Sequence, residues 1–78
     1  MSAVLEQRSA ASDLTRLRRE LGSGWKIAIV IGDDWVRIEF QHGPQNTTLW
    51  ESADFGSIDE AVNHVLCHAS AILRSLDL

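Results

Sequence analysis

Apolar and polar residues follow two different periods along this chain, and each change of period marks a new element of secondary structure. The first pattern has a 4-3-4 spacing, formed by Ala10, Leu14, Leu17 and Leu21. This spacing lines one face of a helix, and Gly22 directly after it is typical of a helix C-terminal cap. We predict a helix over residues 3–21, whose first residue could lie as late as Ser12.

From residue 25 the period becomes two, which predicts strands over residues 25–31 and 34–41. The apolar positions of the first strand are Trp25, Ile27, Ile29 and Ile31. Those of the second strand are Val36, Ile38 and Phe40. We expect these residues to form one apolar face of an antiparallel hairpin, since a slip by one residue would turn half of them into water.

Between the two strands the sequence reads Gly32-Asp33-Asp34-Trp35. Some polymerases hold catalytic metal ions with Gly-Asp-Asp after an apolar strand, but such a site needs further carboxylates and a fold that holds a nucleotide. We interpret Gly32 and Asp33 as the central residues of a type I′ or II′ turn, with glycine supplying the positive φ. The predicted cross-strand pairs are Ile29 with Val36, Ile27 with Ile38, Trp25 with Phe40, and Lys26 with Glu39.

A third strand is predicted over residues 47–52, after a break at residues 42–46 that contains Gly-Pro. Two registers are open. A five-residue loop pairs Ile38 with Trp50 in the core and Arg37 with Glu51 outside, whereas a four-residue loop places Leu49 inside and brings Glu51 inward. We prefer the first, because it pairs a charge and keeps a carboxylate out of the core.

The last pattern predicts a helix over residues 57–76. Ser57 and Glu60 fit a capping box, and an apolar stripe follows at helical spacing: Ile58, Val62, Val65, Ala69, Ile72 and Leu76. The order is therefore helix, three-stranded antiparallel meander, helix (αβββα). We expect a single α+β domain over residues 1–78, with both helices on the apolar face of the sheet.

Composition agrees with one small globular domain, since 45% of the residues are hydrophobic and 23% are charged. The single cysteine, Cys67, excludes an internal disulfide. The N-terminus lacks the apolar core of a signal peptide, and the longest strongly apolar run, residues 27–31, is far shorter than a membrane span. We expect a soluble cytoplasmic protein that does not enter a membrane.

The net charge of −4 is unevenly distributed, with +2 over residues 1–26 and −6 over residues 27–78. The element order resembles that of double-stranded RNA-binding domains, which place Lys and Arg at the start of their second helix. Here that position holds Ser57-Ile58-Asp59-Glu60, so the resemblance is one of order alone and the sequence argues against this mode of binding. An alternative nucleic-acid contact uses the arginines of the first helix: Arg8, Arg16, Arg18 and Arg19.

His64, Cys67 and His68 form the most site-like cluster, because their spacing places three possible zinc ligands on one side of a helix. They lie opposite the apolar stripe or at its margin, however, with no evident fourth ligand. The aspartates and glutamates that are adjacent in the sequence diverge in space and do not form an acid–base pair. We therefore expect no catalytic residues, no metal, no cofactor and no small-molecule substrate.

The face of the sheet away from the helices carries the predicted protein interface, made of Trp35, Val30, Arg37 and Leu49. An exposed tryptophan with a charged rim is typical of an interaction hot spot. The alternative interpretation is that Trp35 lies over Arg37 as a local cation–π contact. Either sheet edge could also pair with another chain, since the strand over residues 25–31 carries one charge only.

The sequence thus favours a non-catalytic protein-interaction module, with a homodimer as its first assembly. A small acidic domain of this kind fits a regulator, adaptor or inhibitor, including the inhibitors of nucleases and CRISPR complexes that phages and mobile elements encode. If the protein blocked an enzyme that binds nucleic acid, surface carboxylates would occupy its phosphate sites. The candidates are Asp33, Asp34, Glu51, Asp54, Asp59 and Glu60.

Overall fold

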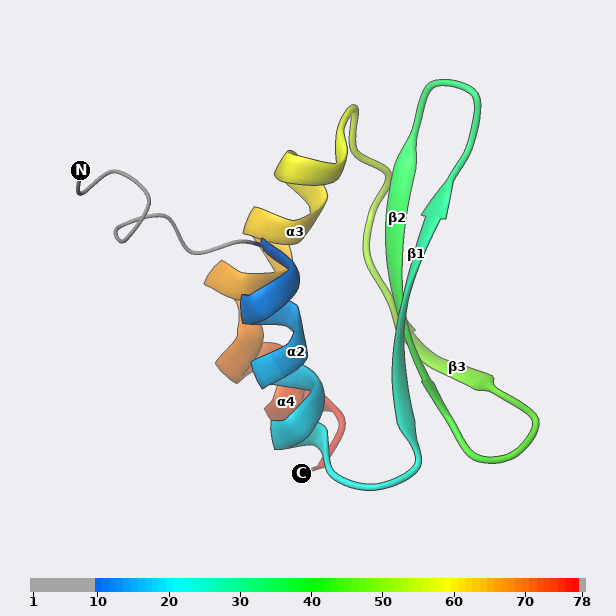
Figure 1. Ribbon diagram of the computed structural model, residues 1–78, viewed down its shortest axis with the longest axis vertical. Coiled ribbons are helices and arrows are strands. Elements are labelled where there is room, and N and C mark those ends of the chain that lie inside the picture. The colour runs from blue at the N-terminus through cyan, green and yellow to red at the C-terminus, as the bar shows by residue number, and fades with distance from the viewer. Residues whose placement is uncertain (1–9, 78) are drawn as a thin grey trace.

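The computed structural model describes residues 10–77 and confirms the predicted α+β fold, with the helices gathered on one side of a three-stranded antiparallel sheet (Figure 1). The elements are α2 (Ala10–Leu21), β1 (Trp25–Ile31), β2 (Val36–His42), β3 (Thr47–Glu51), α3 (Ile58–Cys67) and α4 (Ala69–Ser75). The part of the first predicted helix before residue 10, including Arg8, lies outside the described residues. No helix within residues 10–77 is long and apolar enough to cross a membrane.

The core lies between β2 and the helices, because β2 is the central strand of the order β1-β2-β3. All three apolar residues of β2 that were assigned to the core face are buried: Val36, Ile38 and Phe40. The buried residues of the helices are Leu17, Leu21, Ala61, Val62, Val65 and Ile72. Three residues of the predicted apolar faces are exposed instead, since Ile29 retains 41% of its accessible surface, Ile31 63% and Ile58 41%.

The hairpin between β1 and β2 differs from the predicted one by two residues in register. Ile31 lies opposite Val36, Ile29 opposite Ile38, and Ile27 opposite Phe40. Four residues, 32–35, therefore make the connection, closed by a 2.8 Å hydrogen bond from the Gly32 N–H to the Trp35 carbonyl. The predicted two-residue turn is wrong, and positive φ occurs at other glycines. The predicted Lys26–Glu39 pair is also absent, because Glu39 faces Ala28.

On the other side of β2, the third strand keeps Trp50 on the core side but in a different pairing. Trp50 lies opposite Phe40, with ring centroids 5.0 Å apart, and not opposite Ile38 as predicted. The register shifts between Phe40 and Gln41, which is a β-bulge, and Leu49 is 52% exposed. The bulge moves Glu51 opposite Glu39, so the predicted pairing of Arg37 with Glu51 is wrong.

After β3 the chain continues beside β2 without forming a regular strand. The Ser52 N–H donates to the Ile38 carbonyl at 2.8 Å, and the buried Ser52 Oγ accepts from the Ile38 N–H at 2.9 Å. Val36 and Phe55 then exchange two backbone hydrogen bonds, of 2.8 and 2.9 Å. This segment brings the start of α3 to the end of the sheet that carries the β1–β2 loop (Figure 1).

One C-terminal helix was predicted over residues 57–76, and the structure has two shorter helices in its place. Ser57 is the N-cap of α3 as expected, since its Oγ accepts from the Glu60 N–H at 3.2 Å. His68 separates α3 from α4, with φ −111° and ψ 17°. Its Nδ1 lies 2.9 Å from the His64 carbonyl oxygen, so the side chain engages a backbone group of the preceding turn.

Candidate protein-interaction surface

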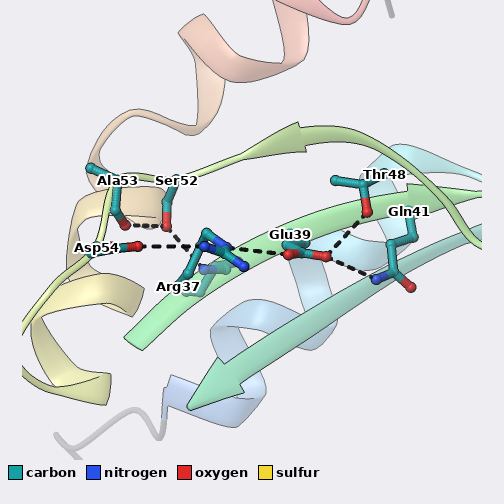
Figure 2. Close-up of polar contacts among 8 residues, drawn as sticks. Arg37, Glu39, Gln41, Thr48, Ser52, Ala53 and Asp54 are labelled. Atoms are coloured by element: carbon teal, nitrogen blue, oxygen red, sulfur yellow. Dashed lines mark hydrogen bonds and ion pairs between the residues drawn. The ribbon is translucent and has the colours of Figure 1, made fainter. Parts of the chain in front are cut away.

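The sheet face away from the helices carries a connected set of polar side chains, shown in Figure 2. Glu39 lies at its centre. Glu39 Oε2 accepts from Arg37 Nε at 3.2 Å, and Oε1 accepts from Gln41 Nε2 and from Thr48 Oγ1, each at 3.1 Å. Arg37 also lies 3.6 Å from a carboxylate oxygen of Asp54. The charged side chains that the sequence predicted around a protein interface are therefore already engaged with one another.

Glu39 is the group whose ionisation the surroundings favour most clearly. The hydrogen bond from Gln41 has the largest effect and lowers the pKa of the carboxyl group below 4.5. The Thr48 hydroxyl and the Arg37 guanidinium lower the pKa further, against an opposing effect of burial. The Glu39 side chain is 14% exposed, so a charged carboxylate is held in place at the middle of the open face.

Trp35 belongs to the loop and is half-buried, not displayed as a free side chain. Its indole lies against Gly32, where an added Cβ would come within 2.1 Å of a ring atom. The guanidinium carbon of Arg37 lies 4.9 Å from the ring centroid, so the predicted local cation–π contact is present. Val30 on β1 is half-buried and lies opposite Arg37 on β2. Leu49 lies on β3, two strands away from Val30. The structure therefore brings three of the four predicted interface residues together and separates the fourth.

A second surface lies along the free edge of β1, which the sequence indicated as an edge that could pair with another chain. Ile31 is 63% exposed and Ile29 is 41% exposed, although both lie on the apolar face of the sheet. The helices reach only part of this strand, and a groove between α2 and β1 remains open, lined by Leu14, Thr15, Arg18, Ile27 and Ile29. The sequence did not predict the exposure of Ile29 and Ile31, because the alternation of apolar residues in β1 does not show how much of the strand the helices cover.

The backbone of β1 also offers unpaired groups at this edge. The Gly32 N–H donates to Trp35 at one end of the hairpin, and the Gly43 N–H donates to the Gly24 carbonyl at the other. Both bonds show that the even-numbered residues of β1 direct their N–H and C=O groups toward β2. The odd-numbered residues therefore direct theirs to the free edge, and these are Trp25, Ile27, Ile29 and Ile31.

Charge is separated along the same strand. Five of the six predicted acidic candidates lie at the end of the molecule where β1 finishes: Asp33, Asp34, Asp54, Asp59 and Glu60. Lys26 is the second residue of β1 and lies at the opposite end, next to the last turn of α2 with Arg18 and Arg19. Glu51, at the end of β3, is separate from the acidic end.

The arginines of α2 were the alternative nucleic-acid contact. Arg16 and Arg19 are exposed, but Arg18 donates to the Gly22 carbonyl at 2.5 Å and so caps its own helix. Of the three described arginines in this predicted contact, Arg18 therefore already has a hydrogen-bond partner within the protein.

The histidine–cysteine cluster has a packing arrangement of its own. His64 is half-buried and lies against Phe55, with ring centroids 5.0 Å apart, and its ring also stacks on His68 at 4.3 Å. Cys67 is exposed, with its Sγ 3.8 Å from Asn63 Oδ1. Among residues 10–77 no group of three or more His, Cys, Asp or Glu side chains is arranged to hold a metal ion. His64 is thus partly covered by Phe55.

Comparison with protein families, with curated proteins and with solved structures finds no match to this chain.

Proposed function

We propose that this domain is a non-catalytic protein-interaction module that self-associates, and that it acts as a regulator, adaptor or inhibitor of another protein. One observation carries the proposal, which is the exposed apolar edge of β1. Ile29 and Ile31 are large, apolar and open to solvent, on a strand whose outer backbone groups have no partner strand among residues 10–77.

An edge of this kind is one that folded proteins normally protect. Natural edge strands carry inward-pointing charges, a proline or a bulge, or are covered by a helix or loop, because a bare edge pairs with other chains. β1 has a single charged residue, Lys26, at its start and none from Ile27 to Ile31. The free edge of β1 from Ile27 to Ile31 therefore favours the addition of another strand.

The open face supports association less strongly than the edge does. Arg37 and Glu39 already form an ion pair, and Trp35 contacts both Gly32 and Arg37. A partner that bound there would have to displace or accept these contacts, which reduces the affinity that the surface can offer. The acidic end is a second feature that suits an inhibitory role. Its carboxylates could take the place of phosphate groups in the binding site of a phosphate-binding protein.

The test is the molar mass in solution, measured by light scattering over a wide range of protein concentration. We expect a mass near twice that of the chain, which falls toward the monomer value on dilution. A mass equal to one chain at every concentration would contradict the proposed self-association. Circular dichroism on the same samples shows whether a change in mass reflects dissociation or unfolding.

A further inference from the structure

We infer that a second copy of this chain pairs with the β1 edge in antiparallel orientation, with Ile29 opposite Ile29 of the second copy. The two three-stranded sheets then form one continuous six-stranded sheet. This inference rests on the proposed self-association and specifies its geometry.

The backbone sets which registers are possible. Only the odd-numbered residues of β1 direct their N–H and C=O groups to the free edge. Each hydrogen-bonded pair between the two copies must therefore join an odd-numbered residue to an odd-numbered residue. With Ile29 on the two-fold axis, Ile27 faces Ile31 of the second copy, and Ile31 faces Ile27. Each of these opposed pairs exchanges two hydrogen bonds, which satisfies the outer backbone groups of the strand.

The side chains fit the same register. The odd-numbered residues of both copies lie on one face of the joined sheet, because side chains alternate along a strand. Ile31, which is 63% exposed, then lies beside Ile27 of the second copy, and the two Ile29 side chains meet at the axis. The contact removes from water the two large apolar residues that α2 leaves uncovered on β1.

Charge favours this register over the one centred on Ala28, and it favours a second copy over an unrelated strand. The pairing places Lys26 opposite Gly32 of the second copy, next to Asp33 and within reach of Asp34. A register centred on Ala28 would place Lys26 opposite Val30, away from the carboxylates. The same strand thus supplies a cation at its start and anions just past its end, which complement each other only when two copies run antiparallel.

The register predicts an experiment in which charge at one position decides assembly. In Ile29→Lys, two like charges face each other across the axis, and in Ile29→Glu the same holds for two carboxylates. We expect each variant to be a folded monomer, with the Kd of the dimer raised by about 100-fold or more. An equimolar mixture of the two should form a heterodimer, because Lys then faces Glu. Leu49→Lys is the matched control, since Leu49 is 52% exposed on β3 and should dimerise as the wild type does.

Native mass spectrometry of the mixture separates the outcomes. Dimers of Ile29→Lys as tight as those of the wild type would overturn the inference while leaving self-association intact. Two monomeric variants that fail to combine would also overturn it, because the position would then not face itself. A wild type that is monomeric throughout contradicts the proposed function, and the inference with it.

A cysteine test decides the question if either charged variant fails to fold. Ala28 and Val30 of the second copy form a pair without mutual hydrogen bonds in this register, where the two Cα atoms approach closely enough for a disulfide. In a Cys67→Ser background, Ala28→Cys mixed with Val30→Cys should cross-link under mild oxidation, and neither alone should do so. Cross-linking of Ala28→Cys with itself, or no cross-linking in the mixture, would overturn the register.

Discussion

The indole of Trp35 lies directly against the α-carbon of Gly32, so closely that a Cβ at residue 32 would approach ring atom Cε2 to 2.1 Å. The glycine is needed here for space and not for positive φ, which in the described glycines occurs at Gly22, Gly24 and Gly43. This contact, with Arg37 on the ring, sets the conformation of the loop between β1 and β2.

We predict that Gly32→Ala lowers the free energy of unfolding by about 1–3 kcal/mol, because the methyl group must push the indole away from its place. The measurement is urea denaturation followed by circular dichroism. Trp35→Ala provides the control background, in which the cost of Gly32→Ala should largely disappear. Equal costs in both backgrounds would show that the contact does not set the loop.

A second prediction concerns Ser52, which is 7% exposed and accepts the Ile38 N–H at 2.9 Å while its hydroxyl donates to the Ala53 carbonyl at 2.8 Å. Ser52→Ala leaves the buried N–H without this acceptor. We expect a loss of about 1–3 kcal/mol in the free energy of unfolding, measured by urea denaturation. Ser70→Ala, on an exposed position of α4, is the matched control and should be close to neutral. A Ser52→Ala variant as stable as this control would contradict the assigned role.

The difference between prediction and structure follows from what periodicity can encode. A slip of two residues in the hairpin leaves every side chain on its original face, so the alternation from Trp25 to Phe40 predicted the core face but not the loop length. Glycine and aspartate suggested a two-residue turn, whereas the packing of Trp35 on Gly32 favours four residues. No local sequence pattern predicts that Trp35 and Gly32 are in contact.

The candidate site was harder to predict for a related reason. The role of Ser52 and the break at His68 both depend on hydrogen bonds to specific backbone groups. The exposure of Ile29 and Ile31 depends on how much of β1 the helices cover. In sequence these two isoleucines are indistinguishable from core residues, so the sequence indicated that the strand edge could pair with another chain but not that Ile29 and Ile31 are exposed there.

The third prediction concerns pH. The pKa of Glu39 is lower in the folded protein than in the unfolded chain, chiefly through the hydrogen bond from Gln41. The unfolded state therefore binds the proton more readily, and the stabilisation is fully present above pH 4.5 and is lost as the pH falls through the folded pKa. Thr48→Val removes one donor and should raise the pKa of Glu39, which an NMR titration of its carboxyl carbon measures directly.

Thr47→Val is the control for this titration, because Thr47 is the neighbouring exposed threonine on the same strand. It should leave the Glu39 titration unchanged. Denaturation at several pH values completes the test. The stability difference between the wild type and Glu39→Gln should be largest near neutral pH and should shrink below pH 4.5. A difference that is constant with pH would show that the charge of Glu39 contributes nothing to folding.

The last prediction concerns the charges that orient the proposed dimer. Lys26 should lie close to Asp33 of the second copy, so Lys26→Asp and Asp33→Lys should each raise the Kd of the dimer, by about 2- to 10-fold for two exposed pairs. The doubly substituted chain restores attraction with the signs exchanged, and its Kd should return toward the wild-type value. Sedimentation equilibrium at low and moderate salt measures these constants, and added salt should weaken the wild-type dimer.

Glu51→Lys is the control, since it changes the net charge by the same amount as Asp33→Lys but lies at the end of β3. It should leave the Kd near that of the wild type. If Glu51→Lys and Asp33→Lys weakened the dimer equally, overall charge and not the Lys26–Asp33 pair would govern assembly. If the double variant were weaker than either single variant, the two residues would not face each other, and the antiparallel arrangement would lose its electrostatic support.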